Sequence, residues 1–292
     1  MLCRKIALIG VGLLGGSLGL ATRQRRVAAQ VHGFVRREAS LKECLAKGAV
    51  DEATLDLRAA VEDADLVVFC TPLGQIARLA QEMLGSLKEG AIVTDVGSVK
   101  ATVVAEVEPL INSVGAHFIG SHPMAGAEKV GVDHARADLF EGAVCAITPT
   151  RASNAEALRK VKELWRAVGA RIIRLPPALH DELVSRSSHL PHVVAAELAN
   201  YVLSPAHSKE QPQLCSNGFR DTTRIASGSP EMWRDIALAN RQHLGRVLGV
   251  FIEDLQEFQH ALEIVDVKAI TEFFEKAKQR RDGWCLESGD GE

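Results

Sequence analysis

The chain has 292 residues, of which 47% are hydrophobic and 24% charged, a composition typical of a soluble globular protein with one large or two smaller domains. A net charge of −3, with no long basic stripe, argues against binding to nucleic acid or to an anionic membrane surface. No apolar stretch approaches the roughly eighteen uninterrupted residues of a membrane span. We therefore expect a small-molecule partner, with no nucleic acid and no membrane.

The cysteines indicate the compartment. Six of them are spread along the sequence with no C-x-x-C pair, at Cys3, Cys44, Cys70, Cys145, Cys215 and Cys285. Such spacing favours reduced thiols over a disulfide framework or a zinc site, so we expect a cytoplasmic protein without a metal. The N-terminus offers an alternative, since its basic start and apolar run also resemble a signal peptide. Glycines within that run and arginines directly after it argue against this alternative.

A glycine-rich turn follows the first predicted strand. The apolar run 6–9 enters Gly10-x-Gly12-x-x-Gly15 and leaves as a Leu/Gly-rich helical pattern. In a dinucleotide site Gly10 permits the tight turn, Gly12 lets the backbone approach a pyrophosphate, and Gly15 lets the helix pack closely, while N–H groups at the helix start hold the anion. The cofactor-binding residues expected here are Gly10, Gly12, Leu13, Leu14 and Gly15.

The end of the second predicted strand, 31–34, should carry the residue that selects the cofactor. NAD enzymes usually have an acid there, whereas this chain has Val35-Arg36-Arg37. Two guanidiniums can hold a 2′-phosphate through charge-assisted bonds, so NADP is favoured over NAD. In the alternative, Arg36 and Arg37 form a solvated turn and Glu38 meets the ribose.

Strands and helices continue to alternate as far as Pro176-Pro177. Strands are expected at 66–70, 91–95, 118–121, 143–148 and 171–175, and helices at 39–47, 74–87 and 153–167. This pattern predicts a Rossmann-like, doubly wound parallel α/β sheet over residues 1–176, with the ligand crevice at the carboxyl ends of the strands. Thr71, Pro72, Ser98 and His122 lie in loops expected at that crevice.

The second domain, 177–283, reads as all-helical. Helical periodicity is strong at about 178–203, 231–262 and 266–281. A few long helices bury little surface by themselves, so we expect this domain to pack against a second copy of the chain. The acidic, glycine-containing tail 284–292 is expected to be disordered.

Several polar residues are candidates for chemistry. An enzyme that removes hydride from an alcohol needs a base and a group that orients the hydroxyl, and His122 and Ser98 fit by position. In the alternative, His122 only satisfies a backbone group. Arg224 stands in a connection between helices, where it could fork a carboxylate or form a solvated pair with an acid. His189 and His192 could bind a metal, cap or pack, and no third ligand stands at a recognisable spacing.

Five segments in one order resemble the prephenate/arogenate dehydrogenase family of tyrosine biosynthesis. They are GVGLLGGS within 6–17, TDVGSVK at 94–100, GSHPMAG at 120–126, SHLPH at 188–192, and GFRDTTRI at 218–225 followed by PEMW at 230–233. The resemblance runs from about residue 4 to 281. We therefore expect neither a chorismate mutase segment before it nor a regulatory domain after it.

The resemblance implies roles for particular residues. His122 would be the catalytic histidine, Ser98 would bind the substrate hydroxyl and the nicotinamide, and Arg224 would bind the ring carboxylate. The helical domain would form a homodimer. Four further residues match family positions near the substrate, namely His189, His192, Arg220 and Trp233. The implied reaction is the oxidative decarboxylation of prephenate to 4-hydroxyphenylpyruvate with hydride transfer to NAD(P)+, and the alternative substrate is arogenate, which would yield tyrosine.

The sequence leaves two choices open within the family. The NAD-using members tend to have Asp where Val35 stands, and the arginine pair looks more like the NADP-using members. His192 and Trp233 favour prephenate. The ammonium of arogenate would need an acid near the substrate tail, and the candidates are Glu128 and Glu197, against the cations His192, Arg220 and Lys129.

Three other readings compete with this family. A β-hydroxyacid dehydrogenase would need a lysine in a glycine-rich helix, which the second domain lacks. A non-catalytic dinucleotide-sensing regulator would need a partner surface that the charge distribution does not show. A structural dimerisation module would leave the SHPMAG and GFRDTTR segments without a purpose.

Overall fold

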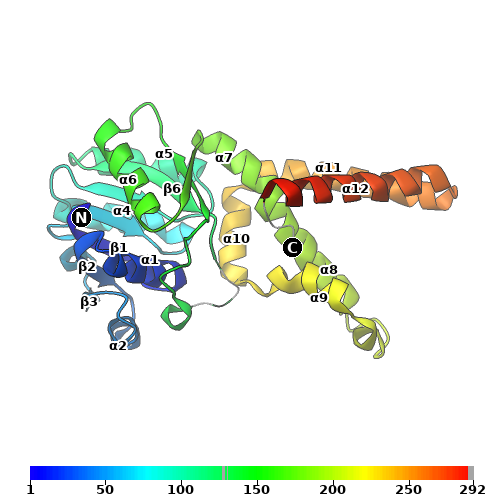
Figure 1. Ribbon diagram of the computed structural model, residues 1–292, viewed down its shortest axis with the longest axis horizontal. Coiled ribbons are helices and arrows are strands. Elements are labelled where there is room, and N and C mark those ends of the chain that lie inside the picture. Colours follow the sequence, from blue (N-terminus) through cyan, green and yellow to red (C-terminus); the bar gives the residue numbers. More distant parts are fainter. Residues whose placement is uncertain (127–128, 130, 289–292) are drawn as a thin grey trace. The chain divides into compact units, whose positions relative to one another are not determined.

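The computed structural model describes residues 1–126, 129 and 131–288. The chain divides into two compact units, Met1–Arg241 and Gln242–Glu292. The first unit contains the sheet and the helices up to α10, and the second contains most of α11 and all of α12 (Figure 1).

The first unit is built on one sheet. In the described residues it has eight strands in the order β3-β2-β1-β4-β5-β6-β7-β8. The strands are β1 (Cys3–Ile9), β2 (Ala28–Phe34), β3 (Glu52–Thr54), β4 (Leu66–Phe69), β5 (Ile92–Asp95), β6 (His117–Pro123), β7 (Val144–Thr148) and β8 (Arg171–Arg174). Because the strand order reverses at β1 and β4, the expected doubly wound fold is confirmed, and its ligand crevice is expected at the carboxyl ends of these two strands.

One strand pair departs from the expected parallel sheet. β7 runs antiparallel to β6, with Gly120 opposite Thr148 and Pro123 opposite Cys145, whereas every other pair that the structure describes is parallel. A parallel return needs a crossover, usually a helix. In the part of 124–143 that is described, the connection contains only the 3₁₀ turn Val132–His134.

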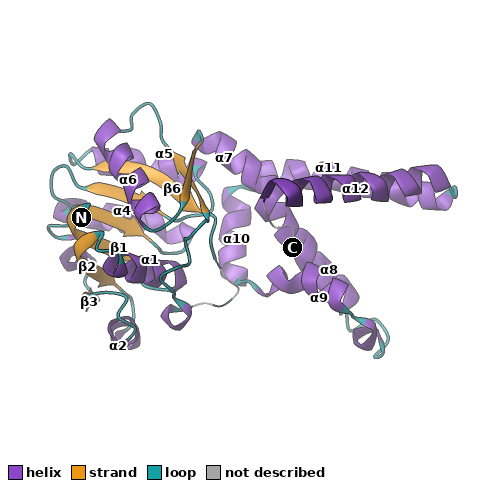
Figure 2. Cartoon of the chain, in the orientation of Figure 1, coloured by secondary structure: helices purple, strands orange, loops and turns teal. Residues whose placement is uncertain are grey.

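Helices cover both faces of the sheet (Figures 1 and 2). Alternate residues of β1 point into separate cores, since Ile6 and Leu8 pack in the core that includes α1 and α6, while Ala7 and Ile9 pack in the core that includes α3, α4 and α5. The helices are α1 (Leu13–Gln24), α2 (Glu38–Ala46), α3 (Leu57–Val61), α4 (Ile76–Met83), α5 (Ala101–Asn112) and α6 (Ala155–Ala167). Burial on both faces explains why the central strands are almost wholly apolar.

The sequence pattern missed three of these elements. β3 is a polar edge strand of three residues and α3 a helix of five, so both are too short for a periodic signal. α5 contains several β-branched valines and an internal proline, Pro109, which weaken the helical pattern.

Beyond β8 the described chain is helical, as expected. The helices that follow β8 within the first unit are α7 (Pro177–Val184), α8 (Leu190–Val202), α9 (Asn217–Thr223) and α10 (Pro230–Ala239). A π turn at Ser185–His189 interrupts the long helix predicted at 178–203. Pro191 stands just after it, and a proline removes one helical hydrogen bond and clashes with the carbonyl four residues earlier, which a π turn accommodates.

The second unit is a pair of helices, α11 (Arg241–Glu263) and α12 (Val267–Ser288). They pack through Phe258, whose ring lies 4.5 Å from that of Phe273 and 5.8 Å from that of Phe274, measured between centroids. The helix predicted at 231–262 is divided at Asn240, which ends α10. The tail is expected to be disordered from residue 284, but α12 continues to Ser288. Residues 289–292 lie outside the described residues.

Within the described chain, no helix combines the length and the apolar character needed to span a membrane.

A buried ion pair lies beneath the carboxyl ends of β5 and β6. The ammonium of Lys100 contacts the carboxylate of Asp95, and both side chains are 0% exposed. Lys100 Nζ also donates to the carbonyl of Ser121 at 3.0 Å, and Asp95 Oδ1 accepts the N–H of Ser121 at 3.1 Å. Each charge is therefore compensated by the other and by backbone groups.

We expect Lys100→Met to lower the free energy of unfolding by about 3–5 kcal/mol, because it leaves the Asp95 carboxylate buried and unpaired. The matched control is Lys88→Met, which breaks the part-exposed pair between Lys88 and Asp65 and should cost about 1 kcal/mol or less. Urea titration of both variants measures the difference. Equal losses in the two variants would contradict the importance of burial.

Candidate active site

A cavity of about 640 Å³ lies within the first unit. It is lined at the carboxyl ends of several strands and by helices that follow β8. Its walls come from the glycine-rich turn, the connections after β4 and β5, the end of β6, and residues of α8 and α10. This is the position expected for a ligand in a doubly wound sheet.

The glycine-rich turn has the shape that the motif predicts. Gly10 has φ +99°, a conformation that favours glycine, and its N–H donates to Phe34 O at 3.0 Å. A Cβ at Gly15 would lie 2.0 Å from the carbonyl oxygen of Gly10, whereas a Cβ at Gly12 would meet nothing within 4 Å. No side chain caps the start of α1 at Gly12. The turn therefore fits a pyrophosphate that approaches the first N–H groups of α1.

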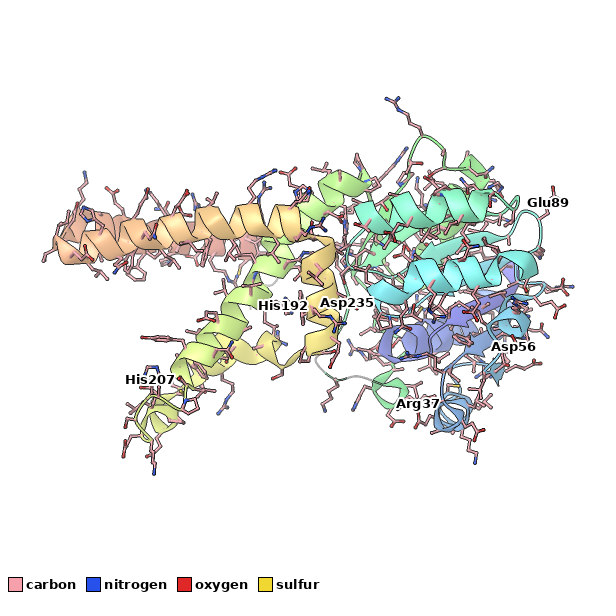
Figure 3. All side chains as sticks on the ribbon, turned by 180° about the vertical axis from the view of Figure 1, so that it is seen from behind. Arg37, Asp56, Glu89, His192, His207 and Asp235 are labelled. Atoms are coloured by element: carbon pink, nitrogen blue, oxygen red, sulfur yellow. The ribbon has the colours of Figure 1, made fainter. Side chains whose placement is uncertain are left out.

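The predicted cofactor residues fall into two groups. Those that line the cavity are Gly12, Leu13, Leu14, Thr71, Pro72 and Ser98. The other group lies outside the lining. Gly10 and Gly15 shape the turn. Val35 is 4% exposed and packs in the core, so its side chain does not face a cofactor. Arg36 and Arg37 are exposed between β2 and α2, where Figure 3 labels Arg37.

The sequence pattern predicts His122 in the loop after β6, but this residue lies in the strand itself. Pairing with β7 extends the strand to Pro123, and His122 stands opposite Ala146. The residue is 7% exposed and lines the cavity. A ladder position holds the imidazole more rigidly than a loop would.

Two residues to which no sequence motif points lie behind His122. The first, His180, contacts His122, and the second, Asp181, contacts His180. His122 Nδ1 lies 2.8 Å from His180 Nε2, and His180 Nδ1 lies 2.7 Å from Asp181 Oδ1. His180 and Asp181 belong to α7 and are 1% and 2% exposed. A consecutive His-Asp pair at a helix start was the available signal, but nothing in the linear sequence joins it to His122.

The environment keeps His122 neutral. Burial lowers its pKa well below the ordinary value of 6.5, because little water is present to solvate an imidazolium, and interactions with His180, Lys100 and His189 act in the same direction. A neutral imidazole next to a cavity can accept a proton from a ligand.

Ser98 lies at the cavity in the connection between β5 and α5. Backbone contacts on either side hold this connection, since Gly97 N–H donates to Asp95 Oδ2 at 2.9 Å and Lys100 N–H donates to Asp181 Oδ1 at 2.7 Å. The structure thus brings the hydroxyl of Ser98 and the imidazole of His122 to one cavity, as predicted.

His192 and Trp233 form the wall of the cavity contributed by α8 and α10. Their rings are stacked with centroids 3.6 Å apart and an interplanar angle of 29°, and Figure 3 labels His192 beside α8. His192 Nδ1 donates to the carbonyl of Ser188 at 2.9 Å. Burial lowers the pKa of His192, and this hydrogen bond partly opposes the shift. Arg224, in the 3₁₀ turn after α9, also lines the cavity.

Some residues expected near a substrate lie elsewhere. His189 is 1% exposed behind the lining, where its Nδ1 accepts from Asn240 Nδ2 at 3.0 Å and its ring packs edge-on to Trp233. Burial lowers its pKa to about 4. Arg220 is exposed on α9 and Glu197 is exposed on α8, both outside the lining.

The charge of the lining is positive among the residues that the structure describes. Lys129 and Arg224 line the cavity, and no described lining residue is an acid. Glu128 lies outside the described residues. Such a lining suits an anionic ligand.

Two family models match the chain. The model described as prephenate dehydrogenase, nucleotide-binding domain, matches residues 18–174, and the model described as prephenate dehydrogenase, dimerization domain, matches residues 176–278. The chain belongs to the prephenate dehydrogenase family. The resemblance inferred from the five segments is thereby confirmed, and the protein is an NAD(P)-dependent oxidoreductase.

Curated relatives of this family are similar over nearly the whole chain. The prephenate dehydrogenase of Bacillus subtilis is 33% identical over 96% of this chain and 76% of its own length. The cyclohexadienyl dehydrogenase of Zymomonas mobilis is 32% identical over 95% of each chain.

Solved structures of the family are similar in fold. Prephenate dehydrogenase from A. aeolicus, in complex with hydroxyphenyl propionate and NAD+, superposes with a TM-score of 0.90 at 29% identity, covering 96% of this chain and 98% of that one. Synechocystis arogenate dehydrogenase superposes with a TM-score of 0.81 at 30% identity, covering 96% and 99%.

We expect Gly12→Ala to weaken NAD(P)+ binding about tenfold or more, equivalent to 1.4 kcal/mol, while the melting temperature stays near that of the wild type. The added methyl group fills open space that the pyrophosphate would occupy. The matched variant Gly15→Ala should instead lower stability by about 1–3 kcal/mol or more, because its Cβ meets the Gly10 carbonyl. Calorimetric titration and thermal unfolding measure the two effects. Full NAD(P)+ affinity in a folded Gly12→Ala protein would place the pyrophosphate elsewhere.

Proposed function

We propose that this enzyme converts prephenate to 4-hydroxyphenylpyruvate and CO2 with NADP+ as the hydride acceptor. The observation that carries the proposal is the position of His122. It is a buried, neutral imidazole at a cavity that also contains the glycine-rich turn, Ser98 and Arg224. A base, a hydroxyl and a cation next to a dinucleotide turn are what this oxidation requires.

His122 acts as the base of the reaction. NADP+ held at the glycine-rich turn would supply the acceptor for the hydride on C4 of the ring. The C4 hydroxyl becomes a carbonyl and gives its proton to His122, while Ser98 orients the same oxygen. The C1 carboxylate leaves as CO2, and the electron pair of the broken C–C bond makes the ring aromatic, which supplies the driving force. The C4 oxygen becomes a phenolate and takes the proton back from His122 to give the phenol of the product. The protein therefore contributes mainly orientation and a proton acceptor.

Arg224 binds the ring carboxylate in this proposal. Its planar guanidinium can fork a carboxylate with two hydrogen bonds, which an ammonium cannot do. Too tight a grip in the ground state would oppose loss of CO2, so the arginine serves substrate binding more than the chemical step. The stacked rings of His192 and Trp233 form a rigid wall beside it.

The substrate is prephenate in preference to arogenate. The two share the ring, its carboxylate and its hydroxyl, and they differ in the tail, which is a ketone in prephenate and carries an ammonium in arogenate. The described lining supplies Lys129 and Arg224 and no acid. Among these described residues an ammonium would find no anionic partner, whereas prephenate, which carries two carboxylates and no cation, suits a cationic lining.

The cofactor preference rests on Arg36 and Arg37. Both are exposed where β2 ends, the position at which a ribose is recognised in this fold. A 2′-phosphate gains charge-assisted hydrogen bonds from guanidiniums, while an acid, which would repel it, is absent from 35–37.

The helical region forms a homodimer in this proposal, and the domain boundary lies after residue 176. The second unit supports a dimer because Val250, Leu255, Leu262 and Phe274 are each about half exposed. The matched family models, 18–174 and 176–278, support the boundary. We place the enzyme in the cytoplasm, since Cys3, Cys44, Cys70, Cys145 and Cys215 are thiols and not disulfides.

The first test of the function is turnover. Prephenate and NADP+ should yield NADPH, followed by absorbance, together with CO2 and 4-hydroxyphenylpyruvate. In a mixture of equal concentrations prephenate should be consumed before arogenate. Preference for arogenate would show that an acid faces the tail, and no turnover of either compound would favour a sensor over an enzyme.

The mutational arm of that test is His122→Asn. We expect kcat to fall about 10²–10⁴-fold, the usual span for a lost general base, with NADP+ affinity retained. In the wild type, kcat/KM should fall on the acid side only when pH drops below 6.5 and approaches the lowered pKa of His122. The variant should lose that acidic limb. A variant with near-wild-type kcat and an intact limb would make His122 structural.

The cofactor proposal predicts a shift toward NAD+ when both Arg36 and Arg37, which are exposed after β2, become neutral residues. Each charge-assisted contact contributes roughly 1.5–3 kcal/mol, so the ratio of kcat/KM for NADP+ over NAD+ should fall about tenfold or more. A control with Arg37→Lys alone should shift the ratio less, since it keeps the charge. An unchanged ratio in the variant that lacks both arginines would move cofactor selection to other residues.

A further inference from the structure

A buried row of three side chains connects the cavity to the start of α5. His122 on β6 contacts His180, and His180 contacts Asp181, over distances of 2.8 and 2.7 Å. All three residues are 7% exposed or less. Water is therefore largely excluded from the contacts between them, so each hydrogen bond needs one donor and one acceptor from the side chains themselves.

Asp181 can only accept hydrogen bonds in this row. Its Oδ1 accepts the N–H of Lys100 at 2.7 Å and its Oδ2 accepts the N–H of Ala101 at 2.8 Å, at the start of a helix of 12 residues. Both carboxylate oxygens thus face donors, and they lie next to the positive end of the α5 dipole. The contact between Asp181 and His180 Nδ1 then requires the hydrogen on that nitrogen.

This requirement passes along the row. A neutral His180 with its hydrogen on Nδ1 presents Nε2 as an acceptor. His122 must therefore carry its own hydrogen on Nδ1 to donate to His180. The remaining ring nitrogen of His122, Nε2, is left with a lone pair for the ligand at the cavity. The opposite tautomer would point an N–H at the substrate hydroxyl and leave two acceptors facing each other at His180.

Other nearby polar groups do not compete for these roles. His189 is the next buried histidine, and its Nδ1 accepts from Asn240 Nδ2. Asn240 Nδ2 also donates to the main-chain carbonyl of Asp181 at 2.9 Å, so it holds the backbone of α7 and not the carboxylate. Lys100 directs its ammonium to Asp95 and the Ser121 carbonyl.

We propose that His180 and Asp181 are positioning residues that hold His122 in the tautomer whose Nε2 accepts the substrate proton. The inference rests on the proposed role of His122 as the base. In the chemical step the O–H bond of the substrate breaks and its proton joins Nε2 of His122. The Nδ1–H continues to donate to His180, so the same hydrogen bond serves the neutral imidazole and the imidazolium, and no group of the row has to turn.

The test compares His180→Leu with His180→Gln. Leu cannot accept from His122, so kcat for prephenate should fall about 10²-fold or more, with KM and NADP+ affinity near wild type. The amide of Gln can accept from His122 and donate to Asp181, so it should restore kcat to within about tenfold of the wild type. A structural role alone would not distinguish two folded variants in this way. The control is His32→Leu, a partly buried position on β2 outside the cavity lining, which should leave kcat unchanged.

A readout independent of activity is ¹⁵N NMR of protein with labelled histidine, assigned by loss of the signal in His122→Asn. We expect an unprotonated Nε2 and a protonated Nδ1 for His122 in the wild type. A protonated Nε2, or a His180→Leu variant with wild-type kcat, or a folded His180→Gln variant as inactive as the Leu variant, would overturn the inference. An enzyme that turns over neither substrate yet shows the expected tautomer would contradict the proposed function and leave the arrangement of His122 intact.

Discussion

The carboxylate of Asp181 is the group on which the arrangement of the site depends. It accepts two backbone N–H groups at the start of α5 and one imidazole from its neighbour His180. The N–H groups of a helix start cost free energy when they are buried without an acceptor, and here an acid from α7 supplies it. One side chain therefore joins the helical segment to the helix after β5 and to the histidine at the end of β6.

Lys100 connects that carboxylate to the sheet. Its backbone N–H donates to Asp181, while its ammonium contacts Asp95 and the carbonyl of Ser121, the residue before His122. Trp165 on α6 donates from Nε1 to Ser121 Oγ at 3.0 Å and closes the network from the other face. His122 and the connection that carries Ser98 are thus held from several directions before a ligand binds, which is the preorganisation that the proposed reaction needs.

The glycine-rich turn and the cavity wall formed by His192 and Trp233 have different physical origins. The turn depends on local geometry, because a Cβ at Gly15 cannot coexist with the Gly10 carbonyl. The wall depends on packing between helices, because His192 and Trp233 come from α8 and α10 and touch only when the chain has folded. Motif spacing therefore predicts the glycine-rich turn but gives almost no information about the contact between His192 and Trp233.

The sequence by itself determined the dinucleotide turn, the alternation of strands and helices, the helical character after residue 176, and the segments that carry the family. These properties follow from steric rules and periodicities that act over a few residues. Tertiary structure decided that β7 returns antiparallel, that His122 stands in a strand, that Val35 is buried, and that Arg220 and His189 lie outside the cavity lining. It also decided that His180 and Asp181 stand behind His122. Contacts between residues far apart in the chain depend on the packing of the whole unit, and no local pattern encodes them.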